Sequence, residues 1–166
     1  MVHALSLPVT GLSVRDLLNT HSAVHDELRR RGVFRSANNP KGDYAEWLVS
    51  SKIGFELAGN SVKGFDATDA RHVRYQIKAR LVHAHNVSTQ IRPIRSLVGN
   101  DFDILIAVVF DSAWNVNLAA RVMHKAAQKM AVYRQHVNGH VMQIHCSMFS
   151  VAGVLEIIET LRDGWK

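Results

Sequence analysis

The sequence predicts a single domain of the mixed α/β (α+β) class, with helices flanking a mixed central β-sheet. Its 166 residues, 47% of them hydrophobic, suit one domain with a continuous core. The uninterrupted apolar run Ile104–Phe110 is typical of a central strand that is buried on both faces. Helical patterns come first, strand patterns dominate the middle of the chain, and helical patterns return late, which favours a layered arrangement.

Two helices and a short strand are expected first. Ser13 precedes apolar residues at helical spacing that continue to Gly32, which predicts a capped amphipathic helix. After a turn-rich segment, Asp43 opens a second helical stretch that ends at about Ile53. A strand over Phe55–Ala58 follows.

The middle of the chain predicts a hairpin and two further strands. Val62–Thr68 can pair with His72–Leu81 across a polar turn at Asp69. Along the second of these strands, alternate residues face opposite sides of the sheet. The apolar side carries Val73, Tyr75, Ile77, Ala79 and Leu81, and the polar side carries His72, Arg74, Gln76, Lys78 and Arg80. The central strand Ile104–Phe110 is followed by a strand from Trp114 to about Val122.

The C-terminal part is expected to contain two helices and a strand. The patterns predict a helix over His124–Arg134, a strand over His140–Cys146 and a last helix over Val151–Leu161, beyond which Trp165 is a candidate core residue. The single cysteine, Cys146, cannot form an internal disulfide and is expected to be a small buried thiol.

Composition and hydropathy also indicate where the protein is located and what it binds. The longest apolar run is far shorter than the roughly 18 residues that a membrane span needs, and the N-terminus lacks the pattern of a signal peptide. We therefore expect a soluble, cytoplasmic protein that does not bind membranes. Twenty Lys and Arg against fourteen Asp and Glu give a formal charge of +6, which favours polyanionic partners such as nucleic acid.

One group of residues suggests chemistry. Glu46 lies on the second helix, Asp66 on the first strand of the hairpin, and Gln76-Ile77-Lys78 on the next strand. Period-two geometry places Gln76 and Lys78 on one face, about 6.6 Å apart along the strand. Pairing of the two strands through the turn brings Asp66 beside them.

These residue types suit a magnesium site. Mg²⁺ prefers oxygen ligands and keeps several water or phosphate ligands. Asp66 offers a carboxylate, Gln76 an amide oxygen and Ile77 its backbone carbonyl, while Glu46 reaches the metal directly or through water. Lys78 is then placed to contact the attacking water or the scissile phosphate.

Glu46, Asp66 and Gln76-x-Lys78 resemble the active site of the PD-(D/E)xK nuclease superfamily, over roughly residues 43–129. Two segments, Asn39–Glu46 and Lys63–Ala67, together with the strand residues from Tyr75, look like a small bacterial subgroup. The resemblance implies a restriction-endonuclease-like three-layer core and Mg²⁺-dependent hydrolysis of DNA, with Mn²⁺ as a substitute. Two positions depart from the family pattern: Gln76 replaces the usual second acid, and Phe65 stands where the motif has proline.

The same resemblance implies a division of the chain into segments and a set of partners. It gives one nuclease-like domain over 1–166, with an N-terminal helical segment (1–38), a catalytic core (39–130) and a C-terminal strand and helix (131–166). Since one such site cuts one strand, we expect a homodimer or a partner subunit, in a restriction or defence setting. The expected nucleic-acid contacts are Arg74, Arg80, Gln90, Arg92 and Arg95.

Other interpretations of the same residues stay open. The fold could be a catalytically inactive module that binds nucleic acid or a protein partner, with Gln76 recording lost metal affinity. The polar residues of the hairpin could also be an ordinary solvent-exposed strand face. The histidine sets lack acid or cysteine partners at zinc spacing, so no zinc site is predicted. These sets are His83 with His85, and His136 with His140 and His145.

Overall fold

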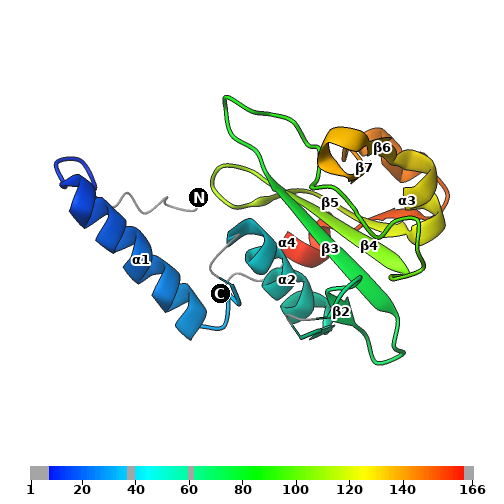
Figure 1. The fold of residues 1–166 in the computed structure, drawn as a ribbon, viewed down its shortest axis with the longest axis horizontal. Coiled ribbons are helices and arrows are strands. Elements are labelled where there is room, and N and C mark those ends of the chain that lie inside the picture. Colours follow the sequence, from blue (N-terminus) through cyan, green and yellow to red (C-terminus); the bar gives the residue numbers. More distant parts are fainter. Residues whose placement is uncertain (1–7, 37–39, 60–61, 163–166) are drawn as a thin grey trace.

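The computed structural model describes residues 8–36, 40–59 and 62–162, and a six-stranded sheet forms its centre (Figure 1). The strand order is β1-β2-β3-β4-β5-β8; β3 and β4 are parallel and all other neighbours are antiparallel. The strands of this sheet are β1 (Glu56–Leu57), β2 (Ala67–Thr68), β3 (Arg74–Leu81), β4 (Ile104–Phe110), β5 (Val116–Met123) and β8 (Val154–Glu156). The other elements are α1 (Val14–Arg30), α2 (Pro40–Ile53), α3 (His124–Met130), β6 (Val132–Arg134), η1 (Gln135–Val137), β7 (Gly139–Val141), η2 (Cys146–Ser150) and α4 (Ile158–Arg162).

The sheet lies between two hydrophobic cores. On one face it packs against α2 and α4, which contribute Leu48 and Leu161. On the other face it packs against α3 and irregular segments that contribute Ile94 and Met148. Every residue of β4 is buried, and alternate side chains enter the two cores. The predicted mixed class and the central strand buried on both faces are therefore confirmed. No helix within the described ranges is long and apolar enough to cross a membrane.

The hairpin has the predicted partners but pairs over a shorter length. β2 pairs with β3 only at Ala67 and Thr68, opposite Tyr75 and Arg74. The Asp69 side chain closes the turn by accepting hydrogen bonds from two backbone N–H groups, at 2.9 and 3.0 Å. On β3 the apolar residues enter the first core as predicted.

Boundaries of two other strands and one helix also differ from the expectation. β1 is limited to two residues within the expected Phe55–Ala58. β5 begins at Val116 because Trp114 occupies the preceding turn, with a φ of 66°. α2 extends back to Pro40, so Asp43 lies within its first turn and is buried.

α1 forms as predicted but stands apart from the body of the protein (Figure 1). The Ser13 hydroxyl accepts a hydrogen bond from the Asp16 N–H at 3.2 Å, which caps the helix. No residue of α1 is buried against the described part of the chain, and Leu18 is 63% exposed. The apolar stripe therefore has no partner among the described residues.

Two C-terminal predictions are wrong because sheet pairing overrides the local pattern. The helix expected over His124–Arg134 ends at Met130, and the next residues form β6, which pairs with β7 across a turn at Asn138. Asn138 has a φ of 46°, the left-handed conformation that such turns need. The strand expected over His140–Cys146 ends at Val141. Cys146 begins η2 and is exposed, so the expected buried thiol is also wrong.

The helix expected over Val151–Leu161 is also wrong. The segment contains β8 and the short helix α4, separated at Ile157. Val154 pairs with Val122 of β5 and is buried, whereas Leu155 points outward and is 57% exposed. The strand and the helix together bury Val154, Ile158 and Leu161, while Leu155 stays exposed. Trp165 lies outside the described residues.

Candidate active site

Asp66 occupies the edge of β3 at the point where β2 leaves it. Its backbone N–H donates to the Tyr75 carbonyl at 2.7 Å, next to the Ala67–Tyr75 pair. Its carboxylate Oδ2 then accepts a hydrogen bond from the Ile77 N–H at 2.6 Å. The Asp66 carboxylate therefore takes the place of a backbone acceptor. It satisfies the Ile77 N–H, which a longer β2 would have satisfied with a backbone carbonyl.

The Ile77 carbonyl points out of the same edge. Backbone groups of residues two apart on a strand face the same side, so Ile77 faces the side on which Tyr75 bonds to Asp66. The paired residues of β2 end before this point, so the carbonyl lies beyond the paired part of the edge. An acceptor is thus available beside the Asp66 carboxylate.

Lys78 reaches the same carboxylate. Its Nζ lies 3.6 Å from Oδ2 of Asp66, and the two side chains are 20% and 24% exposed. This partial burial limits screening by water, so the pair interacts more strongly than an exposed ion pair. The structure brings together Asp66 and Lys78, as the hairpin predicted.

Glu46 approaches from α2. Its Oε2 lies 3.5 Å from Nη1 of Arg35, and its side chain is 23% exposed. Burial, followed by repulsion from Asp66 and Asp43, raises the pKa of Glu46 to about 7, although Arg35 and Lys78 oppose the shift. The repulsion between Glu46 and Asp66 places the two carboxylates near each other, and Arg35 and Lys78 partly balance their charge.

Asp43 fixes the position of Arg35. Its Oδ2 accepts hydrogen bonds from the backbone N–H groups of Arg35 and Ser36, at 2.9 and 2.7 Å. Its Oδ1 accepts from the Ser36 hydroxyl at 3.2 Å. Because the segment before α2 is held against the first turn of that helix, the Arg35 guanidinium can reach Glu46. Sequence reasoning assigned Asp43 only a helix-opening role and missed Arg35.

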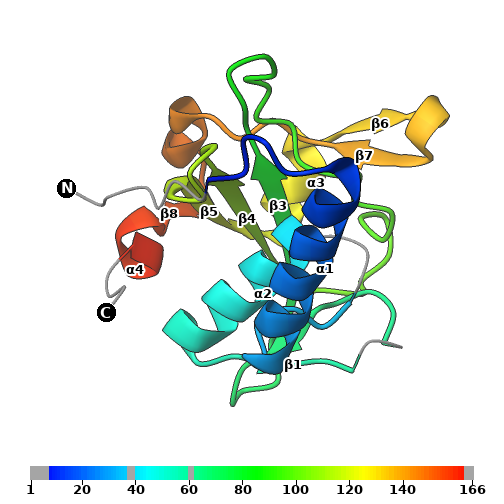
Figure 2. The same ribbon diagram turned by 90° about the vertical axis from the view of Figure 1, so that its left-hand side faces the viewer.

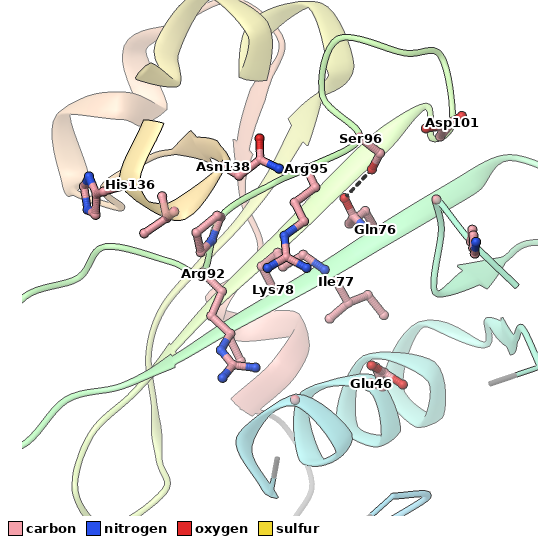
Figure 3. A pocket seen from close by; sticks show the side chains of 16 residues that line it. Glu46, Gln76, Ile77, Lys78, Arg92, Arg95, Ser96, Asp101, His136 and Asn138 are labelled. Carbon is pink, nitrogen blue, oxygen red and sulfur yellow. Dashed lines mark hydrogen bonds between the residues drawn. The ribbon is translucent and has the colours of Figure 1, made fainter. Parts of the chain in front are cut away.

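Gln76 and Lys78 both line the cavity from β3, but the Gln76 amide is hydrogen-bonded to a different segment of the chain. Its side chain is buried, and its Oε1 accepts a hydrogen bond from the Ser96 hydroxyl at 3.3 Å (Figure 3). Ser96 lies 20 residues along the chain. Gln76 therefore faces the 91–96 segment, while the Glu46 carboxylate in Figure 3 lies beside α2. The Ser96 contact was not predicted.

A broad cavity of about 1180 Å³ opens over this part of β3 (Figure 3). Its cationic lining residues are Lys63, Lys78, Arg92 and Arg95, and its acidic ones are Glu46 and Asp101. A smaller cavity of about 240 Å³ is lined by Glu46 and Asp66. Glu46 lines both cavities, whereas Asp66 lines only the smaller one, so Glu46 lies between the cationic cavity and Asp66.

Of the five residues predicted to contact nucleic acid, Arg92 and Arg95 line the cavity and the other three do not. Arg74 forms two hydrogen bonds with the Asp103 carboxylate, at 3.1 and 2.9 Å. Arg80 donates to the Ser88 carbonyl and the Asn86 side chain, both at 2.9 Å. Gln90 lines a separate cavity. The nucleic-acid contacts assigned to these three residues stay predictions.

Lys41 is a further cation that the sequence reasoning missed. Burial, and then repulsion by Arg92 and Arg80, lowers the pKa of Lys41. Positive charge therefore gathers near the N-terminus of α2 as well as along the 91–95 segment. The only signal in the sequence was its place two residues before Asp43, where the helical stretch was expected to begin, and this says nothing about its nearness to Arg92.

The oxygen donors at the edge of β3 suit a magnesium ion held largely by water and substrate. Among the described residues, no three His, Cys, Asp or Glu side chains come together. The donors are two carboxylates, from Glu46 and Asp66, and the Ile77 carbonyl, while the Gln76 amide oxygen accepts from the Ser96 hydroxyl instead. Mg²⁺ commonly binds through one or two carboxylates plus phosphate oxygens and water. Burial, and then repulsion from Asp66 and Asp43, raises the pKa of Glu46, and a bound cation would oppose both effects.

Comparison with models of known protein families gives no match, and no curated protein matches the chain.

Proposed function

We propose that this protein is a Mg²⁺-dependent DNA endonuclease with a PD-(D/E)xK-type site on a restriction-endonuclease-like fold. The observation that carries the proposal is the edge of β3. There Asp66 accepts from the Ile77 N–H and lies 3.6 Å from Lys78, while Glu46 shares its electrostatic environment. The adjoining cationic cavity supports a phosphodiester as substrate.

Each residue has a role in this proposal. Asp66, Glu46 and the Ile77 carbonyl hold the cation, and Gln76 completes the ligand set. When bound, Mg²⁺ or Mn²⁺ supplies Lewis-acid stabilisation and favours the ionisation of water. Lys78 orients the attacking water and balances the negative charge that develops on the phosphate oxygens.

The reaction is the hydrolysis of one phosphodiester. The water oxygen forms a bond to phosphorus, and one P–O ester bond breaks. A proton leaves the attacking water to solvent, and the departing oxygen takes one up, so the products are a phosphomonoester and an alcohol. The raised pKa of Glu46 keeps it partly protonated near neutrality, so binding of the cation displaces that proton.

We further propose a cytoplasmic homodimer formed through α1, in a restriction or defence setting. Val14, Leu17, His21, Val24 and Leu28 follow the alternating three- and four-residue spacing of a coiled-coil seam. Among the described α-helices, α1 alone has no buried residue, so a second copy of the chain supplies the matching seam. Two copies also supply two sites, one for each DNA strand.

The proposal is tested by capturing new DNA ends. Genomic DNA is incubated with the protein and Mg²⁺ or Mn²⁺, and the ends are ligated to adaptors and sequenced. We expect metal-dependent ends with the wild type and none above background with Asp66→Asn or Lys78→Met. Lys125→Met, at an exposed position on α3, is the matched control and should cleave normally. Equal numbers of ends from wild type and both site variants would contradict the proposal.

A second candidate is a nuclease-like module that binds nucleic acid or a protein without cutting. The neutral Gln76, already bonded to Ser96, and the Arg35–Glu46 pair favour it, since they balance part of the site without a cation. Thermal unfolding with Mn²⁺ separates the two. The nuclease proposal predicts stabilisation of about 2.7 kcal/mol at 100 times Kd, absent in Asp66→Asn. Equal shifts in wild type and variant would favour the binding module.

A further inference from the structure

The two-stranded β6–β7 ribbon is separate from the central sheet and projects from the body of the protein (Figure 2). The turn that joins its strands lines the cavity. Its strands pair Val132 with Val141, Tyr133 with His140 and Arg134 with Gly139. The outer surface is uncovered in the described structure, since Val132 and Tyr133 are each 52% exposed. A ribbon with open sides can enter a concave partner.

The base of the ribbon is joined to the segment that carries Arg92 and Arg95. Ile94 and His140 exchange two backbone hydrogen bonds, at 2.8 and 3.1 Å. Gly139 lies so close to Pro93 that a Cβ on the glycine would stand 2.8 Å from the Pro93 Cβ. This contact leaves no room for a side chain, so the ribbon is held in a fixed position relative to the arginines.

The tip of the ribbon faces the catalytic side of the cavity. His136 and Asn138 line the same cavity as Lys78, from the opposite wall (Figure 3). The Tyr133 hydroxyl donates to Oδ1 of Asn138 at 3.2 Å, which orients the amide. Gln135 is also exposed. The tip thus presents the His136 imidazole and the Asn138 carboxamide to the cavity, and a second carboxamide, that of Gln135, is exposed next to them in the chain.

The charge of this part of the chain suits a polyanion. Residues 112–155 contain no Asp or Glu, and neither do residues 70–100, which include β3 and the Arg92–Arg95 segment. A nucleic acid bound between the ribbon and β3 meets no carboxylate from either stretch. The acids facing the cavity are Glu46, at the proposed metal site, and Asp101.

We infer that the β6–β7 ribbon enters the major groove of duplex DNA and that Gln135, His136 and Asn138 contact base edges. This inference rests on the proposed function for the identity of the substrate. The major groove, about 12 Å wide, admits a two-stranded ribbon, and carboxamides pair bidentately with adenine. Arg92 and Arg95 then contact the phosphates between the ribbon tip and Lys78, which fixes the distance between recognition and cleavage.

The test separates recognition from catalysis by using Lys78→Met as the parent protein. Random-sequence duplexes bound by this parent are selected and sequenced to define a preferred site, and affinities are measured by fluorescence anisotropy. The tip is altered by Gln135→Ala and by Asn138→Gly, which keeps the left-handed turn conformation. Gln143→Ala is the control, because this exposed residue lines a different cavity.

Each tip substitution should weaken binding to the preferred duplex roughly 5- to 150-fold and leave binding to a scrambled duplex nearly unchanged. The control should retain the full preference. The inference is overturned if the parent selects no sequence although the wild type cuts DNA, or if the tip variants keep the same preference. If the wild type neither binds nor cuts any DNA, the proposed function itself fails.

Discussion

The Asp66 carboxylate makes one contact that stabilises the fold and another that the proposed chemistry uses. The same Oδ2 atom that accepts from the Ile77 N–H at the end of the β2–β3 ladder also lies within ion-pair distance of Lys78. Its replacement by Asn would keep an acceptor for the Ile77 N–H while removing the charge. The proposed catalytic role of Asp66 and its structural role can therefore be separated by experiment.

Part of this site is predictable from the sequence and part is not. Strand alternation places Gln76 and Lys78 on one side of β3, and hairpin pairing brings Asp66 to them. The Arg35–Glu46 and Ser96–Gln76 contacts depend on irregular segments whose path no local pattern specifies. Such contacts become visible only when the two segments are placed in space.

The raised pKa of Glu46 predicts how the free energy of unfolding depends on pH. Its pKa is 4.5 in its ordinary state and about 7 in the folded protein, so between these values the folded state binds more protons than the unfolded state. Stability from this group therefore falls as pH rises from about 4.5 to 7, by about 3 kcal/mol in total. Glu46→Gln should match the wild type at pH 4 and exceed its free energy of unfolding at pH 8.

Urea unfolding at several pH values measures this difference. Glu56→Gln, at an exposed position on β1, is the matched control and should track the wild type at every pH. If Glu46→Gln also parallels the wild type from pH 4 to pH 8, Glu46 does not have the raised pKa described above.

Gln76→Glu should strengthen metal binding. It restores a second acid on β3, and the Ser96 hydroxyl can still donate to it. Without metal, the added charge at this buried position should lower the melting temperature, because a buried carboxylate needs compensation. With Mn²⁺, the stabilisation should exceed that of the wild type. A thermal shift equal to that of the wild type would show that residue 76 does not face the cation.

For individual helices and strands, the local sequence pattern predicts the structure correctly where the local preference of a segment agrees with its tertiary contacts. The capped helix α1 and the strand β4 fall into this class. The C-terminal third does not, because Val132–Arg134 and Val154–Glu156 join sheets through distant partners. Their apolar spacing also fits a helix, and only the pairing with β7 and β5 decides between the two structures.

The exposed stripe of α1 predicts an oligomeric state that one substitution changes. Val24→Lys, in the seam, should convert a dimer to a monomer in sedimentation equilibrium, since a charge would be buried in the helix–helix contact. The isolated protomer should lose no more than about 0.5 kcal/mol, because Val24 is 46% exposed. Ala23→Lys, on the opposite side of the helix, should leave the dimer intact. A wild-type monomer would contradict the proposed interface.

At the scale of the whole molecule, the distribution of charge matters more than its sum. The formal charge is +6, and the cavity beside β3 gathers four of the cations. Arg95→Ala should weaken DNA binding similarly for all sequences and reduce the slope of log K against log salt by about 1. Anisotropy titrations between 50 and 200 mM salt measure this slope. Arg71→Ala, at an exposed turn, should leave it unchanged.

The most direct test of the whole account is the nicking of a supercoiled plasmid at increasing Mg²⁺ concentrations. The account predicts metal-dependent nicking by the wild type, a loss of about 100-fold or more in Asp66→Asn and Lys78→Met, and a higher Mg²⁺ requirement in Glu46→Gln. Nicking that persists in EDTA, or that is unaffected by both Asp66→Asn and Lys78→Met, would contradict a metal-dependent site at the edge of β3.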